Sequence, residues 1–158
     1  MVVLLVGWTT HLGRPDSVDI LVADSSGILA ALDEGEPDHG RIVALLKSKP
    51  RQLVTTDFVL AEVDYMVLSR LGAESERDFH QQLVDGAFHR EPVLDTDLVS
   101  ALHIAARYSD HAFGITDATL MAICERLGVR DVLTLDHRHF SMFRDRRGRA
   151  LRLLPAAR

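Results

Sequence analysis

The sequence predicts one α/β domain with a mostly parallel sheet. Short apolar runs alternate with stretches of helical periodicity along the chain. Strands separated by helices imply crossover connections and parallel strand pairing, with helices on both faces of the sheet. The chain has 158 residues, of which 47% are hydrophobic, so it is long enough for one domain with a real core and too short for two ordinary ones.

The first half of the chain contains two strand patterns and three helix patterns. Continuous apolar runs indicate strands, and apolar residues spaced three or four apart indicate helices. Gly72 marks the end of the third helix, because glycine favours helix termination. The expected elements are strand 18–23, helix 26–33, helix 39–48 after the turn-rich 35–38, strand 52–55 and helix 57–71.

The second half continues the alternation. Gly128 ends a helix here, and Pro155 ends the last apolar run. The expected elements are helix 74–85, a short extended piece at 89–94, helix 96–108, helix 117–127, strand 131–135 and strand 150–154.

The chain ends and the single cysteine bear on location. We expect residues 1–17 to be an extension outside a domain that spans 18–158; a misassigned start or a partner-contacting arm would both explain it. The apolar run 2–6 is too short to cross a bilayer and lacks the flanks of a signal peptide, so we expect a cytoplasmic protein without membrane contact. Cys124 cannot form an internal disulfide and is expected to be a small core residue.

Four carboxylates stand at positions that suit a metal site. Asp24 and Asp136 follow predicted strands, whose carboxyl ends share the edge where open parallel sheets bind ligands. Asp117 begins a helix, and Glu62 lies inside one. Structural roles are also open: Asp24 could cap a helix, Asp117 could be a first-turn acid behind Thr116 as N-cap, and Asp136 could form an Asx turn.

Glu62 is the least easily explained of the four, because its helix is apolar nearly all the way round. The side chains one turn away are Phe58, Val59, Tyr65 and Met66. A carboxylate in that setting is costly unless a cation or hydrogen-bond donors compensate it. Asp64 shares the helix but projects from the opposite side, so periodicity does not decide which acid faces a site. A salt bridge to Arg70 or Arg41 is the structural alternative for either acid.

Together the acids indicate a cation site. Clustered carboxylates repel one another, so without metal at least one should bind its proton more tightly than usual. Ligation by oxygen alone suits Mg²⁺ or Mn²⁺, which serve the hydrolysis of phosphodiester bonds. We expect chelation to abolish such activity without unfolding the domain.

Charge is unevenly distributed along the chain. Residues 137–152 contain one acid, Asp145, and six arginines: Arg138, Arg144, Arg146, Arg147, Arg149 and Arg152. That segment carries +5, which leaves −10 for the remainder of a chain whose net charge is −5. A basic segment beside an acidic body suits a polyanion such as RNA, and a solvated arginine-rich end is the alternative.

Four segments resemble the acidic motifs of PIN-domain ribonucleases, in the same order and with similar spacing. They are Leu21–Ser26, Thr55–Val63, Gly114–Ala118 and Leu133–Phe140. The resemblance spans residues 18 to about 154. Within that superfamily, the compact size and the closing TLDHRHF are similar to VapC toxins of bacterial toxin–antitoxin pairs.

The resemblance implies a PIN-like three-layer fold and assigns roles by position. Asp24, Glu62, Asp117 and Asp136 would bind catalytic Mg²⁺ or Mn²⁺. Ser26 and Thr134 would form hydrogen bonds within the site, and Asp110 would be an outer ligand. Arg138, Arg144, Arg146 and Arg147 would contact RNA. The chain departs from the family in its long segment before Asp24 and in Asp57, where proline is common.

The sequence therefore predicts a metal-dependent endoribonuclease. By resemblance it would be a toxin that an antitoxin neutralises, and it would form a homodimer. Its RNA target stays open, because different RNAs share the same phosphate chemistry. The alternative is a catalytically inactive PIN-like module that binds RNA or a partner. A receiver domain is disfavoured because no lysine follows Lys49, a dehalogenase-like phosphatase because Ser26 replaces its second aspartate, and a nucleotide-binding module because no glycine-rich loop is present.

Two histidines and two phenylalanines lie near the last acid. His137 and His139 could share a ligand if the segment is extended, but zinc would need further histidine or cysteine ligands, so we expect RNA contact or solvent exposure. Phe140 and Phe143 are expected to pack under the basic loop, with base stacking as the alternative.

Overall fold

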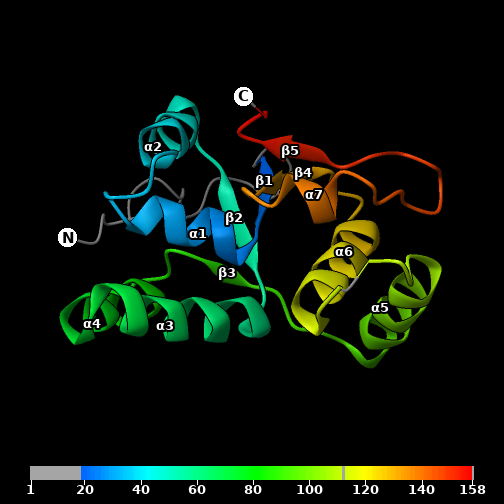
Figure 1. The fold of residues 1–158 in the computed structure, drawn as a ribbon, viewed down its shortest axis with the longest axis horizontal. Coiled ribbons are helices and arrows are strands. Elements are labelled where there is room, and N and C mark those ends of the chain that lie inside the picture. The colour runs from blue at the N-terminus through cyan, green and yellow to red at the C-terminus, as the bar shows by residue number, and fades with distance from the viewer. Residues whose placement is uncertain (1–18, 112, 158) are drawn as a thin grey trace.

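The computed structural model describes residues 19–111 and 113–157, and it confirms the α/β class (Figure 1). The expected extension at 1–17 lies outside the described residues. The elements in chain order are β1 (Ile20–Ala23), α1 (Ser25–Leu32), α2 (His39–Ser48), β2 (Gln52–Thr55), α3 (Asp57–Leu71), α4 (Ala73–Val84), β3 (His89–Arg90), α5 (Asp95–Arg107), α6 (Ile115–Leu127), β4 (Asp131–Leu133), α7 (His137–Phe140) and β5 (Arg152–Leu154).

The strands form a parallel sheet in the order β3-β2-β1-β4-β5. Val22 of β1 lies opposite Val54 of β2 on one side and Val132 of β4 on the other. The chain steps from β1 through β2 to β3 in one direction, then crosses to β4 and β5 in the other. The carboxyl ends of β1 and β4 therefore flank the point where the connections diverge, which is where such sheets bind ligands.

The core lies between the sheet and its helices. Val22, Ala23 and Leu133 are fully buried, and α1 is buried along most of its length. A Cβ added to Gly27 would lie 2.5 Å from the carbonyl oxygen of Leu133, so α1 approaches β4 more closely than any other residue would allow. Cys124 is a buried core residue, as predicted.

The structure corrects several element boundaries. β4 ends at Leu133, two residues before the predicted end. Residues His137–Phe140 form the short helix α7. His137 and His139 therefore do not lie on an extended segment, as a shared ligand would have required. Helix α6 begins at Ile115 with Gly114 as its N-cap, so Thr116 is not the cap. In the part of the chain that the structure describes, no helix is long and apolar enough to cross a membrane.

Candidate active site

Asp24 sits at the junction of β1 and α1. Its backbone N–H donates to the Leu133 carbonyl (3.0 Å), which ties the junction to β4. Its side chain caps α1 and is only 2% exposed. The expected capping role is confirmed, and the carboxylate is held in a buried position at the carboxyl edge of the sheet.

Two hydroxyls orient this carboxylate. Ser26 Oγ and Thr134 Oγ1 donate to Asp24 Oδ2 at 2.6 and 2.9 Å. Each hydroxyl oxygen also accepts a backbone N–H: Ser26 from Leu135 and Thr134 from Asp136, both at 2.9 Å. Each hydroxyl can thus accept from a backbone N–H and donate its one proton to Asp24 at the same time. Ser26 and Thr134 therefore hydrogen-bond within the acidic cluster.

Asp136 and Asp117 meet across His139. Asp136 caps α7 by accepting the backbone N–H of His139 (3.0 Å). The imidazole Nδ1 of His139 lies 3.0 Å from Asp136 Oδ2 and 3.4 Å from Asp117 Oδ2. The ring also packs edge-on against Phe113. His139 is thus partly buried and lies between two carboxylates, and its contact with RNA stays a prediction.

The pKa of Asp117 reflects its burial and the carboxylates around it. The pKa of Asp117 is raised from 3.8 to about 6. Burial is the largest cause, followed by the charge of Asp24; Asp136 and Glu62 add smaller increases, and His139 lowers the pKa. The prediction that one acid would hold its proton above the ordinary range is confirmed. The other three predicted acids therefore lie near enough for their charges to act on Asp117.

Glu62 differs from its expected setting. It is exposed on α3, and among the described residues its side chain has no hydrogen bond or ion pair. Phe58 and Tyr65, expected to bury it, are 40% and 71% exposed. The desolvation argument for Glu62 is therefore wrong, although its charge does act on Asp117. Part of the apolar surface of this helix faces solvent, so an apolar neighbourhood in the sequence did not mean burial.

Asp64 faces away from this cluster. Its Oδ1 lies 2.6 Å from Nε2 of His80 on α4. The expected salt bridge to Arg70 or Arg41 is wrong, since Arg41 instead binds Asp38 (2.7 Å). The sequence did not predict the contact with His80. Asp64 and His80 lie on different helices, and helical periodicity relates only residues of the same helix.

The role of Asp110 as an outer ligand stays a prediction. Asp110 is exposed in the turn after α5, and in the described ranges no hydrogen bond or ion pair joins it to the carboxylates. Arg138 lies on α7, exposed and two residues from Asp136. Of the predicted RNA-contacting arginines, Arg138 is thus the one that follows the acids directly.

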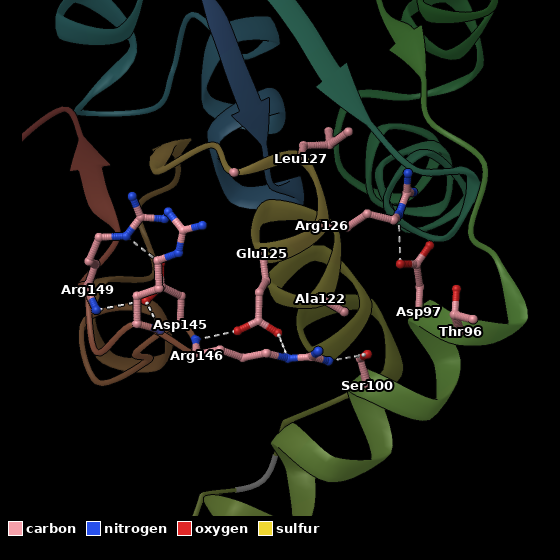
Figure 2. Close-up of a pocket in the computed structure, with 12 residues that line it drawn as sticks. Thr96, Asp97, Ser100, Ala122, Glu125, Arg126, Leu127, Asp145, Arg146 and Arg149 are labelled. Carbon is pink, nitrogen blue, oxygen red and sulfur yellow. Dashed lines mark hydrogen bonds and ion pairs between the residues drawn. The ribbon is translucent and has the colours of Figure 1, made fainter.

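Arg146 and Arg147 lie toward the far end of α6, where they line a cavity of about 530 Å³ between α5, α6 and the loop 144–149 (Figure 2). Glu125 is eight residues beyond Asp117, which corresponds to about 12 Å along the helix. Arg146 binds Glu125 (3.0 Å). Arg147 is exposed, and its backbone N–H donates to Asp145. The structure does not bring these arginines to the acids.

Arg144 and the aromatic residues have a structural role in the same loop. Arg144 Nη1 donates to the carbonyls of Ser141 and Phe143 at 2.7 and 2.8 Å, and its backbone N–H donates to Tyr108 Oη. Phe140 and Phe143 are buried, which confirms that they pack beneath the loop rather than stacking on a base.

Three comparisons place the chain among known proteins. Residues 21–145 match the family model described as PIN domain. Ribonuclease VapC26 of Mycobacterium tuberculosis is 33% identical over 135 residues, which covers 85% of this chain and all of that protein. The crystal structure of Mycobacterium tuberculosis VapC20, described as a sarcin–ricin loop cleaving toxin, has a TM-score of 0.69 at 22% identity and covers 77% of this chain and 92% of that one. The structural likeness concerns the fold.

Proposed function

The chain belongs to the PIN domain family, with a VapC ribonuclease among its relatives, and from that premise we propose that it is a metal-dependent endoribonuclease toxin. The observation that carries the proposal is the gathering of acids at one edge of the sheet. Thr134 joins the Asp24 carboxylate to the backbone of Asp136, and His139 lies 3.0 Å from Asp136 and 3.4 Å from Asp117. The charge of Glu62 also acts on Asp117. These side chains come from four segments far apart in the sequence. Mutual repulsion of this kind destabilises the fold unless a cation or a proton neutralises it, so such clusters are candidates for functional sites.

The donor set fits a hard divalent cation. The four acids offer carboxylate oxygens only, and Asp24 Oδ1 has just one long contact, with Ser25 Oγ at 3.4 Å, while its Oδ2 is held by two hydroxyls. We propose that these acids hold Mg²⁺ or Mn²⁺. When bound, the cation supplies activation of water and neutralisation of charge on the scissile phosphate.

The residues of the chain have distinct parts in this proposal. Ser26 and Thr134 fix Asp24 so that no side-chain rotation is needed when the substrate binds. Asp117 and His139 face one another at 3.4 Å and share a proton-binding environment. With Asp117 binding the cation, the imidazole of His139 would lie beside a cation ligand and close to the reacting phosphate.

The arginines extend the substrate contact. Arg138, beside Asp136, is placed to bind phosphate next to the scissile bond. Arg146 and Arg147, toward the opposite end of α6, would contact the RNA backbone away from the reaction. Arg144, whose backbone N–H binds Tyr108, would also contact the RNA backbone. Binding over that span favours a structured RNA over a short oligonucleotide.

We further propose an antitoxin partner and a homodimer. The support is apolar surface on α5, where Leu94, Leu98, Val99 and Leu102 are 39–69% exposed. Three of these lie four residues apart on one helical face, so they present a stripe that another chain could cover.

The test is cleavage of a mixed tRNA and ribosomal RNA pool with Mg²⁺, Mn²⁺ or EDTA. Asp24→Asn and Asp117→Asn should abolish discrete, metal-dependent fragments. Asp95→Asn, at the exposed start of α5, should cleave like the parent chain. RNA binding without cleavage in any metal would instead indicate a binding module and contradict the nuclease proposal.

A further inference from the structure

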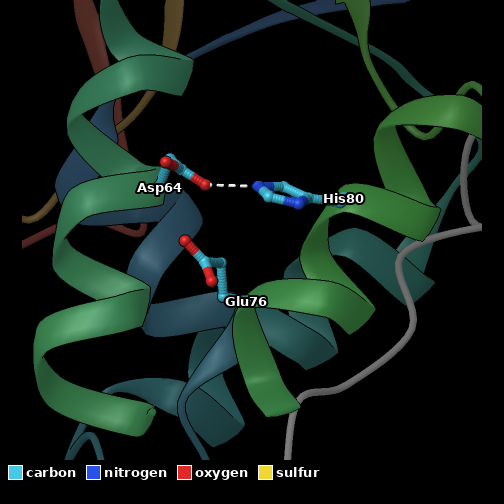
Figure 3. Close-up of side chains that lie close together, drawn as sticks. All are labelled: Asp64, Glu76 and His80. Atoms are coloured by element: carbon cyan, nitrogen blue, oxygen red, sulfur yellow. Dashed lines mark hydrogen bonds and ion pairs between the residues drawn. The ribbon is translucent and has the colours of Figure 1, made fainter. Parts of the chain in front are cut away.

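A second group of potential metal ligands lies between α3 and α4, on the other side of α3 from Glu62. Asp64 comes from α3, and Glu76 and His80 come from α4 (Figure 3). One ligand atom from each residue lies within 4.8 Å of the other two. The set combines two carboxylate oxygens with an imidazole nitrogen, unlike the oxygen-only cluster of the candidate active site.

Local structure explains how three side chains converge here. Glu76 and His80 are four residues apart on α4, so they project from the same helical face. Gly72, with φ +86°, allows α4 to follow α3 almost immediately, and the two helices pack together. That hairpin brings Asp64 opposite the Glu76–His80 face, as Figure 3 shows.

The ion pair between Asp64 and His80 does not account for Glu76. Asp64 Oδ1 and His80 Nε2 are 2.6 Å apart. Glu76 lies within the same group, yet among the described residues its carboxylate has no hydrogen bond or ion pair. Two carboxylates therefore share one imidazole, and the group keeps a negative charge even when His80 is protonated. A divalent cation would neutralise this charge.

The distances suit a single bound ion. Ligand atoms on one zinc ion lie about 2.0–2.2 Å from it, so neighbouring ligand atoms are a little over 3 Å apart. The spacing within 4.8 Å needs only small side-chain movements, and the side chains of His80 and Asp64 are 53% and 39% exposed, so they can make them. Mixed imidazole and carboxylate ligation favours zinc and similar transition metals over Mg²⁺.

We propose that Asp64, Glu76 and His80 bind a divalent transition-metal ion that joins α3 to α4. Three protein ligands leave a fourth position for water or for a group from another molecule. The site is independent of the nuclease activity proposed above, because it shares no residue with the acidic cluster.

The test is calorimetric titration of the full chain with Zn²⁺, together with melting curves. The parent chain should bind Zn²⁺ at this site and melt higher in its presence. Glu76→Gln and His80→Asn should each weaken that binding at least as much as loss of an outer hydrogen-bond partner of a metal ligand does, about 10–100-fold, and should abolish the shift in melting temperature. Without metal, Glu76→Gln should melt no lower than the parent chain, because it relieves a like-charge contact.

Two controls separate this site from others. His103→Asn, which removes an exposed imidazole on α5, and Asp24→Asn, which alters the acidic cluster, should both retain the Zn²⁺ effect. Failure of the parent chain to bind Zn²⁺, or full binding by Glu76→Gln and His80→Asn, would overturn the proposal. Loss of binding in Asp24→Asn alone would place the ion in the acidic cluster and overturn it equally.

Discussion

Burial and three neighbouring carboxylates all raise the pKa of Asp117, and His139 lowers it. The side chain is placed by α6, while the charges that act on it come from β1, α3 and the β4–α7 connection. Proton binding and cation binding therefore compete at this residue.

The first prediction concerns pH. Because the folded chain without metal binds the Asp117 proton more tightly than the unfolded chain does, its free energy of unfolding should fall as pH rises from 3.8 through about 6. Affinity for Mn²⁺ should rise over the same interval, as the proton leaves. Melting curves in EDTA and titrations with Mn²⁺ measure the two trends. Asp117→Asn should lose this component of both, and an unchanged pH profile in that variant would contradict the assignment.

The second prediction concerns Thr134, whose hydroxyl donates to buried Asp24 and accepts from Asp136 N–H. Thr134→Val keeps the side-chain shape but leaves both partners short of a hydrogen bond. We expect the free energy of unfolding to fall by about 1–3 kcal/mol. Chemical denaturation measures this change. Thr96→Val, at an exposed position of α5, is the matched control and should unfold like the parent chain.

At the scale of elements, the site depends on the contact between α1 and β4. The Asp24 backbone and the absence of a side chain at Gly27 hold the first turn of α1 against the Leu133 carbonyl. The same contact positions Ser26 beside Thr134, with their hydroxyl oxygens 3.1 Å apart. Helix position and carboxylate orientation are therefore set together.

The third prediction uses two glycines. Gly27→Ala would place a Cβ 2.5 Å from a backbone oxygen, so α1 must move, and we expect a loss of about 1–3 kcal/mol together with weaker Mn²⁺ binding. Gly40→Ala, in helix α2, meets no atom within 4 Å and should leave stability equal or slightly higher, because alanine favours helix. Equal stability of the two variants would contradict this prediction, because it would show that α1 can move away from β4 at no cost.

At the scale of the whole molecule, we expect the fold not to depend on the proposed cation. The core is a cluster of buried apolar side chains from the strands and the helices. Arg146 and Arg147 lie toward the end of α6 remote from Asp117. Stability, catalysis and RNA binding can therefore be separated experimentally.

The fourth prediction is that EDTA abolishes cleavage but leaves the domain folded. Because the core is formed without the cation, far-UV circular dichroism at room temperature should be unchanged. The melting temperature should fall only by the amount expected from loss of a bound ligand. Unfolding by EDTA at room temperature would instead indicate a structural metal.

The fifth prediction concerns Arg147. Arg147→Ala should raise KM for long RNA and leave kcat unchanged, because the proposal has Arg147 contact the RNA backbone away from the reaction. The slope of log affinity against log salt concentration should fall by about 1. Arg77→Ala, which removes an exposed arginine of α4, is the control. A loss of kcat in Arg147→Ala would place that arginine at the reaction.

Much of the fold was predictable from local patterns. Apolar runs and helical periodicity located the strands and the longer helices, and parallel pairing predicted that Asp24 and Asp136 would meet at one edge. Those features depend on residues close in sequence and on the general chirality of crossovers. Short elements were less predictable: α7 has four residues, too few for a periodic signal.

The sequence by itself determined the α/β class and the acidic quartet, because strand ends follow from local apolar runs. The resemblance to PIN-domain motifs in the sequence also predicted the hydrogen bonds of Ser26 and Thr134. Only the tertiary structure decided that Glu62 is exposed, that His139 lies between two acids, and that Arg146 and Arg147 lie toward the other end of α6. Those outcomes depend on which helices pack together and on where each side chain meets solvent. Contacts between segments remote in sequence fix both, and no local pattern encodes them.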